Sequence, residues 1–179
     1  MNEFEDLKEI GSLSKFRLYN AKLGDKKVLL KMNLEPIPLT IFIKDLCFLD
    51  PSFAKVCGFT LYEKRYHLVY EDEADHREKT LTLKEFIRQY KSSLHFYRDS
   101  LLLQLLDICH RINKHGLFHR NLTLDSLIVR FNEESHDIDL KLFNFNHAIH
   151  ENNIETHYSL EYPRDSIFYV DFFQLQGKM

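Results

Sequence analysis

The chain has 179 residues, 28% of them charged, and a formal net charge of −3. A charge this small, with both signs interspersed, argues against direct binding to nucleic acid or to an anionic membrane. The acidic start of the chain lacks the apolar core of a signal peptide, and no apolar run approaches the roughly 18 residues of a membrane span. We therefore expect an intracellular protein, either cytoplasmic or part of a large cytosolic or cytoskeletal assembly.

The three cysteines, Cys47, Cys57 and Cys109, lie far apart and form no Cys-x-x-Cys pair. Such usage predicts free, buried thiols in a reducing compartment and not a disulfide framework or a metal site.

The first part of the chain predicts a small β-sheet. Strand patterns cover residues 16–21 and 27–32 with a turn between them, and a further hairpin covers 54–61 and 65–70. Between these pairs, prolines 36 and 38 break the chain and a short apolar helix is expected over residues 39–49.

The second part predicts helices and one more hairpin. Thr82, with Glu85 three residues later, predicts a capped helix through residue 90. Apolar residues recur with helical spacing over residues 94–115, and Gly116 ends this longer helix. A hairpin is expected over residues 127–131 and 138–143. Strands first and helices later predict an α+β fold, with a sheet lobe (1–70), a connector (71–79) and a helical lobe (80–179).

Two stretches carry a resemblance to a known family. Residues 118–129 read Phe-His-Arg-Asn-Leu-Thr-Leu-Asp-Ser-Leu-Ile-Val, and residues 144–146 read Asn-Phe-Asn. They resemble the catalytic loop (His-Arg-Asp-Leu-Lys-Pro-Glu-Asn) and the metal-binding loop (Asp-Phe-Gly) of eukaryotic protein kinases. The resemblance implies a protein kinase-like fold, with a small antiparallel sheet lobe and a helical lobe reduced at its C-terminal side.

The resemblance also shows what has been replaced. The catalytic base falls on Asn121 and the two side-chain magnesium ligands fall on Ser126 and Asn144, so no position carries the carboxylates that this chemistry needs. The chain thus resembles a pseudokinase, and we expect it to have no catalytic residue, no metal and no cofactor.

Other positions of the family pattern are weaker. Lys31 matches the lysine that grips the phosphates, as a vestigial contact, although an exposed strand lysine is an equal interpretation. The glutamate that should hold this lysine falls on Ile41. Gly11 remains from the glycine-rich phosphate loop, where a plain turn is the alternative. Tyr70 occupies the gatekeeper position, or is simply a core-facing aromatic.

An apolar segment near the end of the chain predicts a protein contact. Burying side chains of this size stabilises by about 1.5–3 kcal/mol each, and exposed apolar surface usually marks an interface. We expect the segment to dock onto a protein partner or a second copy of the chain; burial inside a compact lobe is the alternative. The residues concerned are Ile167, Phe168, Tyr169, Phe172, Phe173 and Leu175.

Together these features predict a catalytically inactive kinase-fold protein that serves as an interaction or structural subunit of a larger assembly. The alternative is an allosteric regulator that binds a nucleotide, without magnesium, and transfers no phosphate. An enzyme of altered chemistry would need a new base and nucleophile, and no such set is visible.

Overall fold

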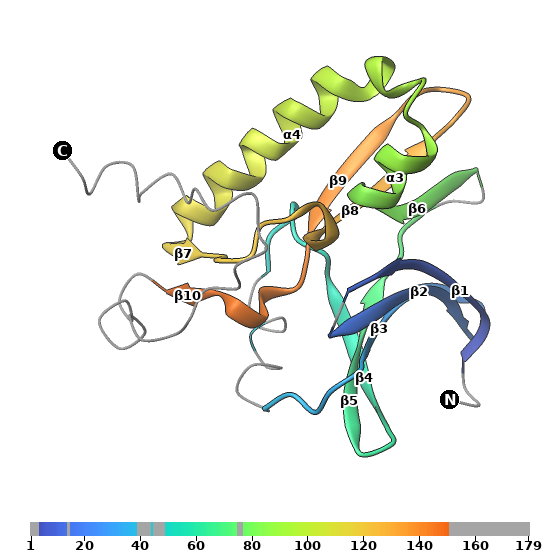
Figure 1. Ribbon diagram of the computed structural model, residues 1–179, viewed down its shortest axis with the longest axis vertical. Coiled ribbons are helices and arrows are strands. Elements are labelled where there is room, and N and C mark those ends of the chain that lie inside the picture. Colours follow the sequence, from blue (N-terminus) through green and yellow to red (C-terminus); the bar gives the residue numbers. More distant parts are fainter. Residues whose placement is uncertain (1–3, 14, 39–43, 45–48, 75–76, 151–179) are drawn as a thin grey trace.

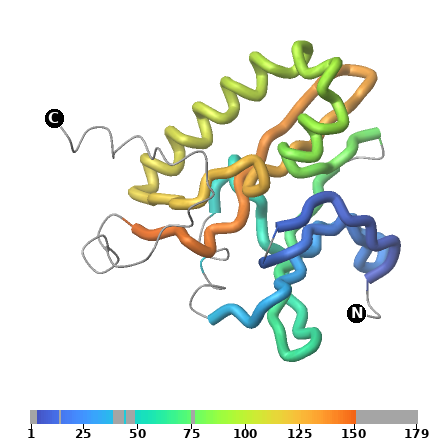
Figure 2. Tube along the Cα trace, viewed as in Figure 1, coloured from blue at the N-terminus to red at the C-terminus, as the bar shows by residue number. Residues whose placement is uncertain are grey.

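The computed structural model describes residues 4–13, 15–38, 44, 49–74 and 77–150 (Figures 1 and 2). Its elements in chain order are β1 (Phe4–Ser12), β2 (Phe16–Leu23), β3 (Lys26–Asn33), β4 (Val56–Tyr62), β5 (Arg65–Glu71), β6 (Glu78–Thr82), α3 (Leu83–Gln89), α4 (Leu94–Lys114), β7 (Leu117–Phe118), η1 (Leu124–Ser126), β8 (Leu127–Asn132), β9 (Ile138–Leu142), η2 (Phe145–His147) and β10 (Ile149–His150).

The first five strands form one antiparallel sheet in the order β1-β2-β3-β5-β4. Its central strand β3 buries four consecutive residues, 28–31, so both faces of this strand are covered. One face joins the main core, and the other is closed by a small cluster that includes Phe4, Val28 and Val69. The edge strand β4 instead alternates, and it leaves Phe59 and Leu61 exposed.

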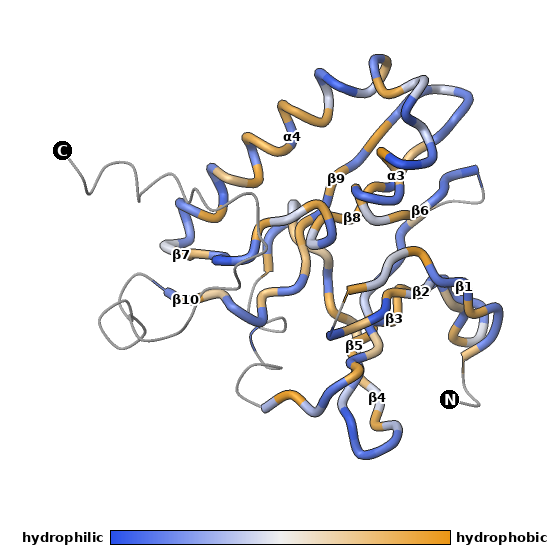
Figure 3. The backbone as a smooth tube through the Cα atoms, viewed as in Figure 1, coloured by the Kyte–Doolittle hydropathy of each residue, from blue (hydrophilic) through white to orange (hydrophobic). Residues whose placement is uncertain are grey.

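A second antiparallel sheet, β6-β8-β9, carries the two described helices. Helix α3 begins where the Thr82 hydroxyl accepts the backbone N–H of Glu85 at 3.2 Å, and α4 lies lengthwise along the β8–β9 hairpin (Figure 1). In Figure 3 apolar stretches recur along α4 between hydrophilic ones. Of its apolar residues, Ile108 and Ile112 are buried in the main core.

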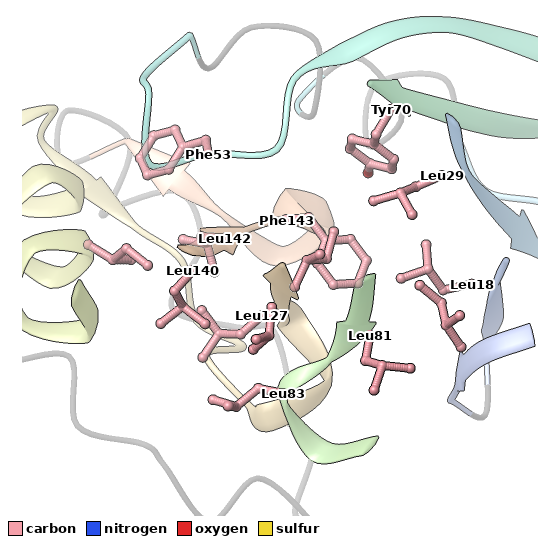
Figure 4. Packing of buried hydrophobic residues seen from close by; sticks show 14 of the residues in the cluster. Leu18, Leu29, Phe53, Tyr70, Leu81, Leu83, Leu127, Leu140, Leu142 and Phe143 are labelled. Carbon is pink, nitrogen blue, oxygen red and sulfur yellow. The ribbon is translucent and has the colours of Figure 1, made fainter. Parts of the chain in front are cut away.

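One hydrophobic core joins the two sheets. Figure 4 shows Leu18, Leu29 and Tyr70 of the first sheet turned toward Phe143, which directly follows β9, and toward Leu81 of β6. A short pair, β7 with β10, places the end of the described chain beside the segment that follows α4. The two sheets therefore lie against each other through side chains, and the loops before and after the β8–β9 hairpin lie at their junction.

The structure confirms the predicted α+β class with antiparallel sheets, and all three predicted hairpins and the long helix are present. Three features differ from the prediction. Strand β1 was not among the predicted strands. Strand β6 occupies the end of the segment expected to be a connector and pairs with β8. Cys57 and Cys109 are free, as predicted, but neither is fully buried: Cys57 on the edge strand is exposed and Cys109 is half-buried. Cys47 and most of the expected helix at 39–49 lie outside the described residues.

Within the described part of the chain, no helix is both long and apolar enough to cross a membrane.

Candidate functional site

The site is centred on the ammonium group of Lys31, in the middle of β3. Its side chain is 0% exposed to solvent, so the interpretation as an exposed strand lysine is wrong. Lys31 Nζ donates to Asn144 Oδ1 at 2.8 Å and to Asn146 Oδ1 at 3.1 Å. It also lies 5.2 Å from the ring centroid of Phe16, within the range of a cation–π interaction. The buried cation is thus held by two neutral amides and an aromatic face.

The backbone of the loop after β9 explains how Asn144 reaches Lys31. Asn144 has φ 67° and ψ 59°, a left-handed conformation that asparagine tolerates better than most residues. The turn redirects the chain into the short helix η2, which begins at Phe145 and carries Asn146. Both amides then face the same ammonium. Of these two acceptors, Asn144 was a predicted site residue and Asn146 was not.

Asn121 and Ser126 are the other two positions at which the resemblance places a replaced catalytic residue. They lie in the segment between β7 and β8. Ser126 is buried, and its hydroxyl is used locally: it accepts the N–H of Thr123 and donates to the carbonyl of Thr123, both at 2.9 Å. Asn121 is half-buried in the same loop. The described contacts therefore join Lys31 to Asn144, and they assign Ser126 to the turn that starts η1.

Several cationic side chains lie close enough to His147 of η2 to affect its protonation. Burial lowers the pKa of the His147 imidazole, and the cations of Lys15, Arg120, Lys44 and Lys31 lower it further. A neutral His147 is the expected form because each of these charges opposes its protonation. A divalent cation is disfavoured in such surroundings for the same reason.

Lys44 adds a contact to this region that the sequence did not reveal. Its Nζ donates to the carbonyl of Ala148 at 2.6 Å, and burial followed by the charge of Arg120 lowers the pKa of the ammonium. The position predicted for the glutamate partner of Lys31, Ile41, lies outside the described residues.

Side chains fill the space between the two sheets next to Lys31. The Phe143 ring meets Phe16 and Tyr70 edge to face, each with 5.9 Å between centroids, and Leu18 and Leu29 complete the packing (Figure 4). All five residues are buried. Tyr70 is therefore a core-facing aromatic.

Strand β1 of the first sheet is in direct contact with the start of α3, next to the second sheet. Gly11 lies within β1 and not in a plain turn, and a Cβ added to it would come within 2.4 Å of Thr82 Cγ2. Backbone and side chain of the two parts are thus in contact where the family resemblance places a phosphate loop. Only a glycine fits this approach.

His115 and His119 stand four residues apart, with Gly116 between them, a spacing that could suggest a metal site, but they have different partners. His115 contacts Asp50 at 3.0 Å, and His119 Nε2 lies 3.2 Å from the carbonyl oxygen of Phe143. Among the described residues, no group of three or more His, Cys, Asp or Glu side chains is placed to hold a metal ion. Each histidine therefore has its own polar contact with a different part of the protein.

The fold and the site define a two-sheet α+β protein with a buried lysine, held by amides, at the junction of its parts. No protein-family model matches the chain, and a search of curated proteins finds no relative. Its function has to be argued from the residues themselves.

Proposed function

We propose that this chain is a catalytically inactive protein with a protein kinase-like fold, which serves as an interaction or structural subunit of a larger assembly. The observation that carries the proposal is the environment of Lys31: a fully buried ammonium bound to Asn144 and Asn146, at the positions where the family resemblance places the magnesium-binding loop. The order of the elements, an antiparallel sheet followed by helices and the β8–β9 hairpin, supports the kinase-like assignment.

The chemistry of the replaced residues supports inactivity. Phosphoryl transfer needs magnesium to neutralise the phosphates and a carboxylate to take the proton of the attacking hydroxyl. Asn121 is an amide and cannot accept that proton at neutral pH. Asn144 and Ser126 are also neutral, and their side chains already bond to Lys31 and Thr123. Asn144 and Ser126 thus have structural contacts in place of the chemical role that the resemblance assigns to these positions.

The packing of the junction favours the structural role over the nucleotide-binding alternative. Lys31 is fully buried, and the Phe16 ring beside its ammonium packs against the buried Phe143, so a nucleotide that approached Lys31 would have to open this packing. It would also have to separate Gly11 from Thr82. Because interiors of this kind are close-packed, such an opening sacrifices contacts that a ligand must replace.

The proposed role requires a protein contact. The predicted contact segment, containing Ile167, Phe168, Tyr169, Phe172, Phe173 and Leu175, lies outside the described residues. Helix α4 supplies a second reason to expect a partner protein or a second copy: Leu102, Leu103 and Leu106 are 53%, 69% and 65% exposed. Grouped exposed leucines are typical of interaction surfaces.

Nucleotide titration of the purified full-length chain tests the proposal. A ligand that binds only the native state at 100 times its dissociation constant stabilises it by about 2.7 kcal/mol, so a thermal unfolding series with 5 mM ATP, with and without Mg²⁺, detects even weak binding. We expect no shift of the midpoint and no transfer of labelled γ-phosphate to protein substrates. ATP stabilisation without transfer would favour the regulator, and Mg²⁺-dependent transfer that is lost in Lys31→Met would refute inactivity.

A further inference from the structure

A cavity of about 380 Å³ opens behind the segment that joins the two sheets. Its wall is formed by the loop before β4, the connector after β5, and parts of β3, β6, β8 and β9, and neither Lys31 nor Asn144 lines it. Ligand pockets in proteins have volumes of about 300–1,000 Å³, so the cavity is large enough for a small molecule or a large side chain.

The floor of the cavity is apolar. Leu29, Phe53 and Ile128 line it, and each is at most 4% exposed. Leu49 and Ala54 also line the cavity, and the Leu49 side chain at its mouth is 78% exposed. A leucine this exposed beside an apolar floor extends the hydrophobic surface outward to the solvent.

The acidic groups of the rim are already engaged within the protein. Glu71 forms an ion pair with Lys55 at 2.9 Å. Asp72 Oδ1 accepts the hydroxyl of Thr80 at 3.0 Å. A cationic ligand would have to compete with these bonds.

The basic groups of the rim are engaged in the same way. Arg130 bonds to Asp139, and Lys141 Nζ donates to the carbonyl of Pro51 at 2.5 Å. An anionic ligand would therefore also break existing interactions. Because both signs are internally compensated, the cavity is suited to a neutral group.

The residues that line the cavity also indicate that the bound group is aromatic. The Phe53 ring, which stands 5.0 Å from Phe145 in an edge-to-face contact, offers a further aromatic surface at the floor. Arg130 and Lys141 place cations on the wall, where the face of a bound ring can meet them. We propose that this cavity binds a small molecule through a neutral aromatic group, because its volume of about 380 Å³ lies within the range of small-molecule sites. The proposal does not depend on the chain being an inactive kinase.

The test uses indole as the probe, and the full-length chain with labelled Ile, Leu and Val methyl groups. Two-dimensional NMR is expected to show saturable shifts of the Leu29, Leu49 and Ile128 methyl signals, with a dissociation constant on the order of 1 mM. N-acetyl-tryptophanamide, whose two amides imitate a peptide backbone, is the comparison. Indole that binds at least as tightly supports a small-molecule site, whereas clearly tighter binding of N-acetyl-tryptophanamide would indicate a side chain presented by a protein and would overturn the assignment. Shifts that do not saturate, or that fall outside these residues, would overturn the proposal.

Two variants locate the site. Ala54→Leu fills the cavity and should weaken indole binding at least about tenfold, whereas Ser92→Leu, the same gain of a leucine at an exposed position between α3 and α4, should leave it unchanged. Leu49→Ser changes only the exposed lip, so it keeps the fold testable if Ala54→Leu does not fold, and it should also weaken binding. Equal affinity in wild type and in the folded cavity variants would refute the site.

Discussion

Lys31 Nζ and Asn144 Oδ1 lie 2.8 Å apart although 113 residues separate them in the sequence, and the bond is buried. It fastens the central strand of the first sheet to the loop that follows the last strand of the second. Because a buried ammonium without acceptors is strongly disfavoured, Lys31 is tolerated in β3 only when this loop is in place. The bond therefore makes the folding of the two parts mutually dependent.

Substitution of Asn144 separates the hydrogen bond from the backbone conformation. Asn144→Gly removes the acceptor but suits the left-handed φ of 67°, so we expect a loss of about 1–3 kcal/mol of unfolding free energy. Asn144→Ala also introduces a residue that resists this conformation, and it should cost roughly 1 kcal/mol more. Urea denaturation followed by circular dichroism measures both. Equal stabilities of the two variants would contradict the backbone argument, and wild-type stability of the glycine variant would contradict the role of the bond.

The contact between Gly11 and Thr82 gives a second prediction. Gly11→Ala places a Cβ 2.4 Å from Thr82 Cγ2 and should destabilise by about 1–3 kcal/mol. Thr82→Ser removes that methyl group and keeps the hydroxyl that caps α3, so the double variant should recover most of the loss. Gly58→Ala is the matched control because nothing lies within 4 Å of its added Cβ.

Thermal and urea unfolding report these stabilities directly. If Gly11→Ala behaves like Gly58→Ala, or if Thr82→Ser fails to rescue it, the two parts of the protein do not meet at this point.

The elements predicted correctly are those encoded by local periodicity. The helical spacing of Leu101, Leu105, Ile108 and Ile112 and the stop at Gly116 were sufficient for α4, because both signals lie within one stretch of chain. Strand β6 was missed because two of its five residues are charged and because Thr82 was interpreted as the start of a helix. Its partner β8 begins 45 residues after β6 ends, so the strand depends on tertiary pairing.

Lys31 and Asn144 were predicted as site residues, but the burial of Lys31 and its contact with Asn146 were not. Asn121, Ser126 and Asn144 were identified by the resemblance to the kinase loops, whereas burial of Lys31 was not expected because lysine is almost never fully buried unless it is paired. The partners of Lys31 lie on a distant loop, and a neutral amide carries no charge pattern that would reveal the pairing. The only sequence signal for Asn146 was its place in the Asn-Phe-Asn triplet, where a second amide oxygen could accept a hydrogen bond from Lys31.

His67 predicts a pH dependence of stability. Its Nδ1 accepts the N–H of Asn33 at 3.0 Å, and burial is the main cause that lowers the pKa of the imidazole. The unfolded state therefore binds a proton more readily than the folded state. Stability is fully present above the unfolded pKa of about 6.5 and is lost as the pH falls through the lower folded value.

The slope contributed by one such group is at most about 1.4 kcal/mol per pH unit. His67→Gln removes the titrating group and should flatten the stability profile between pH 7 and pH 5, as measured by urea unfolding at a series of pH values. Parallel profiles for wild type and variant would exclude His67 as the source.

If the chain is an inactive kinase-like protein, as proposed, introducing the polar residues of active kinases should not create activity. By the kinase resemblance, the triple variant Asn121→Asp, Ser126→Asn, Asn144→Asp supplies a base and magnesium ligands, but it leaves the buried packing of Leu29, Tyr70 and Phe143 unchanged. We expect no transfer of labelled γ-phosphate and no thermal stabilisation by ATP with Mg²⁺. Measurable transfer by the triple variant would show that the junction opens readily, and that the substitutions alone account for inactivity.

The exposed leucines of α4 connect the fold to the proposed assembly. Leu102→Ser combined with Leu106→Ser removes apolar side chains that are more than half exposed, so the unfolding free energy of the isolated chain should change by less than about 0.5 kcal/mol per site. Ile108→Ala, on the buried side of the same helix, should cost about 2–5 kcal/mol. Light scattering coupled to gel filtration then separates stability from association: the leucine double variant should lose mass relative to the wild-type assembly while it remains folded. A wild-type chain that purifies as a monomer without a co-purifying protein would contradict this contact, and so would a double variant of unchanged mass.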